Sequence, residues 1–91
     1  MRTVERHPDA VDALVEEELV VMNVNSLDYF RFSEVAKAIW ELLGSGQLVE
    51  ADICRALMVE YEVTEDECQK AVADFIDDAI SRGFLRVVQE Q

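Results

Sequence analysis

The sequence predicts an α+β fold in which a three-stranded antiparallel sheet is followed by three helices. Over residues 11–32 the apolar residues alternate with polar ones or form short β-branched runs, as in strands. From Ser33 onward they recur with the 3.6-residue period of amphipathic helices. Glycines follow the first and the last helical stretch, at Gly44 and Gly83. Strands first and helices later is the order typical of an α+β domain.

Length and composition favour one small folded domain. The chain has 91 residues, of which 51% are hydrophobic and 31% are charged, the balance of a folded protein and not of a disordered one. Residues 1–10 show no periodicity and include His7-Pro8. We therefore expect a flexible N-terminal arm over residues 1–10, or a short edge segment, followed by one domain over residues 11–88.

The strand region has the pattern of a meander. Residues 11–16 alternate, residues 19–22 form an apolar run, and residues 23–28 supply turn-forming side chains before a third strand at residues 29–32. Alternation along a strand places Phe30 and Phe32 on one face and the residues between them on the other. We expect the two phenylalanines to face the core and the opposite side of the sheet to face water.

The helix boundaries have capping residues. Ser33 is an N-cap candidate for a helix that Gly44 ends, and a second helix is expected at about residues 49–60. The third begins at Thr64 with a capping box completed by Glu67, and it ends at Gly83. Residues 84–88 are apolar enough for a last short strand or a packed tail. This order resembles a winged helix-turn-helix.

The charge of the chain bears on its partners. Twenty acidic residues and eight basic ones give a net charge of −12, which repels nucleic acid and attracts basic peptides, although a merely solubilising surface is an equal alternative. The third helix, which enters the major groove in DNA-binding winged helices, carries six acidic and two basic residues between Glu65 and Arg82. We therefore expect no nucleic-acid partner, and DNA binding stays as the rival function.

Catalytic and metal-binding motifs are missing from the sequence. It has no glycine-rich phosphate loop and no zinc-protease motif. His7 is its single histidine, and its two cysteines, Cys54 and Cys68, lie too far apart in the sequence to indicate a zinc site. The acidic clusters fall at turns or on polar helix faces, which lack the apolar pocket that a carboxyl group needs to act as a general acid or base. We expect no catalytic residue, no metal and no cofactor. With neither a secretory signal nor an apolar run long enough to span a membrane, the expected location is the cytoplasm.

Two segments resemble one protein family. The strand-to-helix segment at residues 29–43 and the acidic apolar helix that ends at residues 83–85 are similar to those of PqqD-like proteins. Phe32-Ser33 stands where the family has leucine-asparagine, and Gly83-Phe84-Leu85 replaces Gly-Leu-Leu. The resemblance covers roughly residues 11–88.

The resemblance implies a function in peptide recognition. PqqD-like proteins are the recognition elements of ribosomally made, modified peptides: they bind the leader segment of a precursor and present it to modifying enzymes. A chain of this length resembles the separate recognition proteins of lasso-peptide pathways, which implies a leader peptidase and a cyclase as partners in trans. Pyrroloquinoline quinone and radical-enzyme pathways remain alternatives.

Strand addition supplies a mechanism for this binding. The edge of a sheet offers unpaired backbone groups to an extended peptide, and side-chain pockets then give selectivity. The third strand and the third helix would form the two walls of the groove. Phe30 and Phe32 are also explained as core residues, and Arg31 as a charge that protects an edge strand. The expected leader-binding residues are Tyr29, Phe30, Arg31, Phe32, Ala71, Phe75 and Asp78.

Three functions remain open from the sequence. They are a leader-binding module, an acidic winged-helix protein that binds DNA or regulates, and a small structural subunit of an enzyme complex. Basic residues on the third helix would favour the second. Instability and exposed apolar surface in the isolated chain would favour the third.

Overall fold

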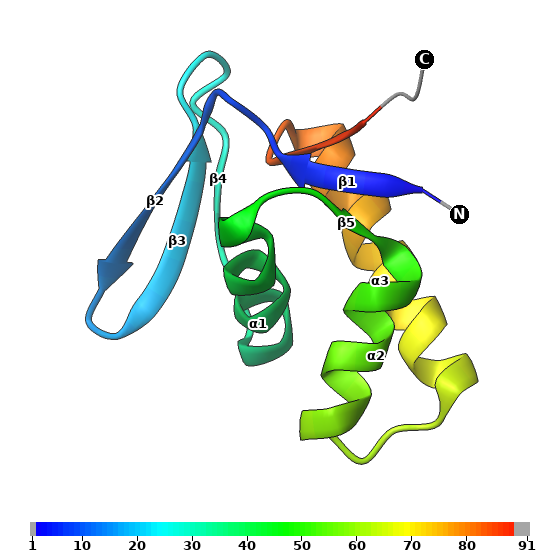
Figure 1. Cartoon of the computed structure of the whole chain (residues 1–91). Helices are drawn as coiled ribbons and strands as arrows, with labels where there is room; N and C mark the ends of the chain where they lie inside the picture. The colour runs from blue at the N-terminus through cyan, green and yellow to red at the C-terminus, as the bar shows by residue number, and fades with distance from the viewer. Residues whose placement is uncertain (1, 89–91) are drawn as a thin grey trace.

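The computed structural model describes residues 2–88, which form three helices and two small sheets (Figure 1). The sheets have the strand orders β2-β3-β4 and β5-β1-β6. In chain order the elements are β1 (Thr3–Arg6), β2 (Ala10–Val15), β3 (Glu18–Asn23), β4 (Tyr29–Arg31), α1 (Glu34–Leu42), the 3-10 turn η1 (Leu43–Ser45), β5 (Leu48–Val49), α2 (Glu50–Glu60), α3 (Glu65–Arg82) and β6 (Leu85–Val87).

The expected meander is confirmed in the sheet β2-β3-β4. Strand β3 lies in the middle and pairs antiparallel with both neighbours, Val21 opposite Asp12 on one side and opposite Phe30 on the other. Glu16 and Glu17 turn the chain between β2 and β3 with positive φ angles of 53° and 72°. Strand β4 forms one edge of this sheet and β2 forms the other.

The second sheet was not expected, and it includes part of the N-terminal segment. Strand β1 lies between β5 and β6, and its Val4 side chain is wholly buried. Residues 3–6 therefore belong to the packed fold, in contrast to the flexible arm expected over residues 1–10. Each partner strand comes from a distant part of the chain, so the local pattern of residues 1–10 gave no sign of the pairing.

The expected N-cap residues are confirmed, whereas the Glu67 carboxylate of the capping box accepts from the Thr64 hydroxyl in place of the Thr64 backbone N–H. Ser33 Oγ accepts a hydrogen bond from the Ala36 N–H, and Thr64 Oγ1 accepts one from the Glu67 N–H. Helix α3 ends at Gly83, whose φ of 78° lies in the left-handed region that glycine adopts most readily. Helix α2 begins directly after β5, without a side-chain cap at Val49.

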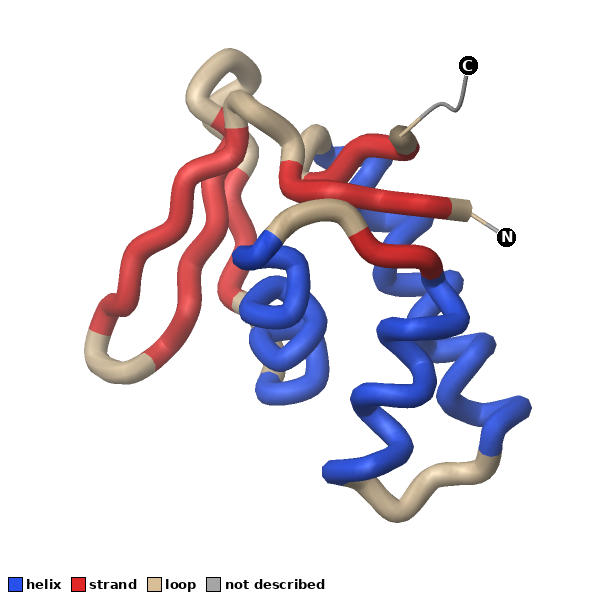
Figure 2. The backbone as a smooth tube through the Cα atoms, viewed as in Figure 1, coloured by secondary structure: helices blue, strands red, loops and turns tan. Residues whose placement is uncertain are grey.

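The core lies between the helices and the sheets. Phe32, directly after β4, packs edge-on against three other aromatic rings, with centroid distances of 5.8 Å to Trp40, 5.5 Å to Phe75 and 6.0 Å to Phe84. This cluster joins β4 to α1, α3 and the start of the C-terminal segment. In Figures 1 and 2 all three helices lie on one side of the sheet β2-β3-β4.

Candidate functional site: an edge strand beside an apolar groove

Strand β4 leaves one row of backbone groups unpaired. The Phe32 N–H donates to the Leu19 carbonyl oxygen, and the Asn23 N–H donates to the Asp28 carbonyl oxygen, so positions 28 and 32 point toward β3. Because backbone groups alternate in direction along a strand, those of Tyr29 and Arg31 point away from β3. These two residues present N–H and C=O groups along the open edge of the sheet.

A groove of about 600 Å³ runs beside this edge, between β4 and α3. Its lining comes from β3, β4, the start of α1, α3 and the segment after α3. The residues are Glu18, Phe30, Arg31, Phe32, Ser33, Glu34, Ala36, Phe75, Asp78, Ala79 and Phe84. A groove of this kind can hold the side chains of an extended peptide paired with β4.

The apolar part of the groove has a buried floor and an exposed rim. Phe32, Ala79 and Phe84 are buried, whereas Phe30 is 45% exposed. The expectation that Phe30 and Phe32 both belong to the core is thus right for Phe32 and wrong for Phe30. The Arg82 guanidinium lies over the Phe30 ring, 4.7 Å from its centroid, and the Phe32 ring lies beside it with a centroid distance of 6.4 Å.

Charged groups gather at the end of the groove where Arg82 lies. The Arg82 guanidinium lies 3.2 Å from an Asp78 carboxylate oxygen and 3.7 Å from an Asp28 oxygen. The side chain of Asp78 is 60% exposed, so it can meet a further cation as well. Arg31 is paired with Glu18 at 3.2 Å. Around the groove the carboxylates of Asp28, Glu34 and Asp78 outnumber the one guanidinium of Arg82, and this balance of charge favours a basic peptide.

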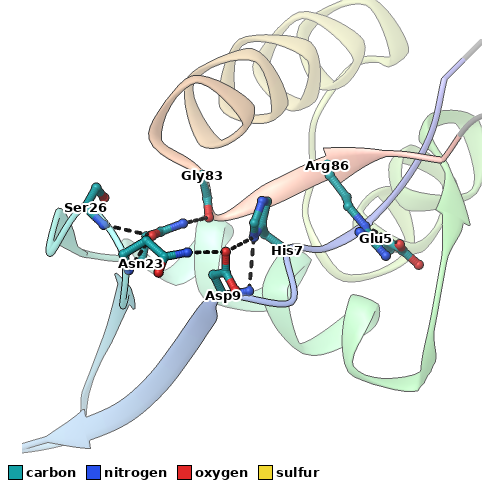
Figure 3. Close-up of polar contacts among 8 residues, drawn as sticks. Glu5, His7, Asp9, Asn23, Ser26, Gly83 and Arg86 are labelled. Atoms are coloured by element: carbon teal, nitrogen blue, oxygen red, sulfur yellow. Dashed lines mark hydrogen bonds and ion pairs between the residues drawn. The ribbon is translucent and has the colours of Figure 1, made fainter.

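A buried asparagine fixes the two walls relative to each other (Figure 3). Asn23, at the end of β3, donates from Nδ2 to the carbonyl oxygen of Gly83 at 2.8 Å. Its Oδ1 accepts from the backbone N–H groups of Asn25 and Ser26 at 2.9 and 3.1 Å. One side chain thereby closes the loop that leads into β4 and ties it to the end of α3.

The structure brings together five of the seven expected site residues. Phe30, Arg31, Phe32, Phe75 and Asp78 line the groove. Tyr29 contributes only backbone to the open edge, because its side chain lies on the opposite face of the sheet from Phe30. Ala71 lies outside the groove, in a separate apolar cavity of about 130 Å³ together with Val35, Leu57, Tyr61, Val63, Glu67 and Cys68.

Several lining residues were missed in the sequence. Ala79 lies four residues after Phe75, on the same flank of α3, and that spacing could have identified it. Glu18 and Phe84 had no such signal, since β3 and the C-terminal segment reach the groove only through tertiary packing. The same holds for Ala36, and at Ser33 the sequence pattern indicated only a helix cap.

Metal-binding clusters, reactive thiols and membrane-spanning helices would each indicate another kind of site. Within residues 2–88 no cluster of three or more histidine, cysteine or acidic side chains could hold a metal ion. Cys54 and Cys68 are buried free thiols, and burial, together with the neighbouring Cys68, raises the pKa of Cys54 to about 11. In the same part of the chain no helix is both long and apolar enough to cross a membrane.

Comparisons with known proteins agree with this architecture. A structure described as TbiB1 in complex with the TbiA(beta) leader peptide has a TM-score of 0.83 and 23% identity, covering 94% of this chain and 99% of that one. A lasso peptide synthetase B1 complexed with the leader peptide has a TM-score of 0.79 and 22% identity, covering 91% and 96%. These likenesses establish a shared fold.

The family follows from the sequence comparison. No curated protein sequence matches this chain. The family model described as Coenzyme PQQ synthesis protein D (PqqD) matches residues 18–85, from the start of β3 into β6. That span includes the open edge of β4 and both walls of the groove. Because the match covers well over half of the sequence, this chain belongs to the PqqD family.

Proposed function

We propose that this chain binds the leader segment of a ribosomally made precursor peptide as an additional strand on β4. The observation that carries the proposal is the open edge of β4 lying beside an apolar groove. Membership of the PqqD family supports it, as does the shared fold with two proteins whose structures contain a leader peptide. The same likenesses favour a pathway of the lasso-peptide type.

The backbone supplies part of the affinity. An extended leader segment would exchange hydrogen bonds with Tyr29 and Arg31, each contributing a net ~0.5–1.5 kcal/mol. Ordering a free peptide costs about 2–5 kcal/mol or more. Backbone pairing at so short a strand therefore leaves little surplus, and buried side chains must supply the rest.

The groove supplies the remaining affinity and the selectivity. Alternate side chains of an added strand point toward α3, where Phe30, Phe75 and Ala79 would surround them. A large apolar side chain that becomes fully buried contributes roughly 1.5–3 kcal/mol. Asp78, on the rim, would pair with a lysine or arginine of the leader. The preferred ligand is thus an extended segment with apolar anchors and a nearby basic residue.

Ala71 extends the proposed binding surface along α3. It lies one helical turn before Phe75, and its small side chain leaves the neighbouring apolar cavity open. We place a further apolar side chain of the leader there. Replacing Ala71 by tryptophan would fill the cavity, so leader affinity should fall while the far-ultraviolet circular dichroism spectrum stays unchanged.

The proposed function is recognition without catalysis. The bound leader would be presented in trans to a peptidase or another modifying enzyme in the cytoplasm, where ribosomal precursors are made. The purified chain alone should therefore show no turnover of the precursor. Cleavage of the leader by the chain without any partner would contradict this proposal.

A pair of substitutions at Arg31 tests strand addition directly. Arg31→Pro removes the N–H that faces the open edge but breaks no hydrogen bond to β3, and proline is tolerated at such edge positions. Arg31→Ala removes the same side chain and keeps the N–H. We expect Arg31→Pro to bind a fluorescent leader peptide about 2- to 13-fold more weakly than Arg31→Ala, the equivalent of one net hydrogen bond.

Fluorescence anisotropy with leader peptides gives the affinities, and thermal unfolding shows that both variants fold. Equal affinities for the two folded variants would mean that the peptide does not pair with this edge. Amide chemical shifts that change elsewhere on leader addition, and leave residues 29–32 unmoved, would place the ligand at another surface.

A further inference from the structure

The face of the sheet β2-β3-β4 that points away from the helices is apolar. Strand register puts Val11, Met22 and Tyr29 in one row across the three strands, and Ala13, Val20 and Arg31 in the next. Val15 and Glu18 complete the face beside the turn. We call these eight residues the outer face: Val11, Ala13, Val15, Glu18, Val20, Met22, Tyr29 and Arg31.

Nothing in the described part of the chain covers the outer face. The helices lie on the opposite side of the sheet (Figures 1 and 2). Val11 is 47% exposed, Val15 49% and Tyr29 66%. The solvated side of an antiparallel sheet normally carries polar residues, whereas the only charges here are the paired Arg31 and Glu18. A contiguous exposed apolar face of this kind marks a protein contact.

The outer face is continuous with the proposed leader site. Tyr29 takes part in both, since its backbone lies on the open edge of β4 and its side chain on the outer face. A leader strand added to β4 would extend the sheet, and every second leader side chain would point to the outer side. A protein that covers this face would therefore touch the leader itself.

Charge distinguishes between two possible occupants of the face. Glu16 and Glu17 form the turn next to it, beside the Glu18 carboxylate, and the whole chain has a net charge of −12. A second copy of the chain would bring an identical acidic turn and the same net charge to the contact. A partner with an apolar centre and a basic rim meets no such repulsion and gains electrostatic attraction.

We propose that the outer face is the docking surface for the enzyme that acts on the bound leader, and that this enzyme offers it an apolar patch bordered by lysine and arginine. The inference rests on the proposed function. It explains why Tyr29 is exposed beside the apolar side chains of Val11 and Met22. It also explains how a small recognition protein can deliver an extended peptide to a separate active site.

The test uses the purified leader peptidase that cuts the recognised precursor. Val11→Lys combined with Val15→Lys places two cations on the outer face, both on β2, and leaves every residue of β4 and of the groove unchanged. The matched control is Val59→Lys with Met58→Lys, two exposed positions on α2 that lie outside both surfaces. Bio-layer interferometry measures binding of the peptidase, and fluorescence anisotropy measures binding of the leader peptide.

We expect the outer-face variant to bind the peptidase at least about tenfold more weakly than the parent. Its affinity for the leader peptide should stay within about twofold of the parent, because charges at the rim of a binding site change the attraction of a ligand only modestly. The control should match the parent for the peptidase. Normal binding of the peptidase by the folded outer-face variant would overturn the inference. So would the finding that the parent forms no complex with the peptidase, either in the presence or in the absence of the leader peptide.

Two other results separate this inference from the proposed function. A parent chain that binds the peptidase through the outer face but no leader peptide would refute strand addition and keep the docking surface. Concentration-dependent dimers in sedimentation, lost in the Val11 and Val15 double variant, would assign the outer face to a second copy and overturn the proposal.

Discussion

Asn23 and Gly83 form a direct link between the strand wall and the helix wall of the groove. The Asn23 amide donates to the Gly83 carbonyl oxygen at 2.8 Å, and a Cβ atom added to Gly83 would lie 2.6 Å from Asn23 Nδ2. Asn23 is the one buried polar side chain among residues 2–88. Glycine is therefore required here for two reasons, the left-handed backbone and the closeness of the amide.

Gly83→Ala should destabilise the fold through both effects. A left-handed conformation costs a non-glycine residue roughly 1–2 kcal/mol, and displacement of the Asn23 amide adds the loss of a buried hydrogen bond, about 1–3 kcal/mol. Urea unfolding measures the free energy in the parent and in an Asn23→Ala background. The cost of Gly83→Ala should be smaller in that background, and an equal cost in both would show that the two residues are energetically independent.

Asp12→Ala should loosen the β2–β3 hairpin from α1. The buried Trp40 donates from Nε1 to Asp12 Oδ2 at 2.6 Å, and without that carboxylate the indole N–H loses its acceptor, at a cost of about 1–3 kcal/mol. Trp40 is the single tryptophan, so its fluorescence reports this site alone. Asp12→Asn keeps an acceptor oxygen and should cost less in urea unfolding. If Asp12→Ala and Asp12→Asn lower the free energy of unfolding equally, the lost charge, and not the lost hydrogen-bond acceptor, is the cause.

Asp78→Lys should weaken binding of a leader that carries a basic residue near its apolar anchors. The new cation repels that residue, and the effect should be largest at low salt, since the Debye length shortens to ≈ 10 Å at 0.1 M. Asp74→Lys changes the net charge of α3 equally at an exposed position that does not line the groove. Anisotropy titrations across a salt series should show a steeper loss for Asp78→Lys. If leader affinity depends on salt equally in Asp78→Lys and Asp74→Lys, the effect comes from the net charge of α3 and not from a contact of Asp78 with the leader.

The buried thiol of Cys54 should make the fold sensitive to alkali. Its pKa is raised from 9.0 to about 11, chiefly by burial, so the folded state favours the neutral thiol. The resulting stabilisation is present below pH 9 and is lost as the pH rises toward 11. The free energy of unfolding should therefore fall more steeply over this range in the parent than in Cys54→Ala. Identical pH profiles for the parent and for Cys54→Ala would show that the pKa of Cys54 is the same in the folded and the unfolded state.

The chain should not retain duplex DNA. Helix α3 carries six acidic residues against two basic ones, and the phosphate contacts that give nucleic-acid affinity come from lysine and arginine. Anisotropy of a labelled random duplex should show no binding at ~150 mM salt, near physiological ionic strength. Sub-micromolar affinity under these conditions would revive the DNA-binding alternative.

Features set by neighbouring residues were predictable. The caps at Ser33 and Thr64 and the end of α3 at Gly83 depend on interactions within a few residues, and the meander depends on alternation along each strand. The position of α3 opposite the third strand was expected from the strand-addition mechanism and not from a pattern within either segment. Five of the seven expected residues follow from that placement and line the groove.

The sequence by itself determined which segments form the meander and the three helices, where those helices begin and end, and that the surface is acidic. Only the tertiary structure decided that β1 pairs with β5 and β6, that Phe30 lies at the rim while Phe32 lies in the core, and that Ala71 lines a separate cavity. The physical reason is the range of the interactions. Caps and periodicity act over one or two turns, whereas short strands and groove walls are fixed by contacts between residues tens of positions apart.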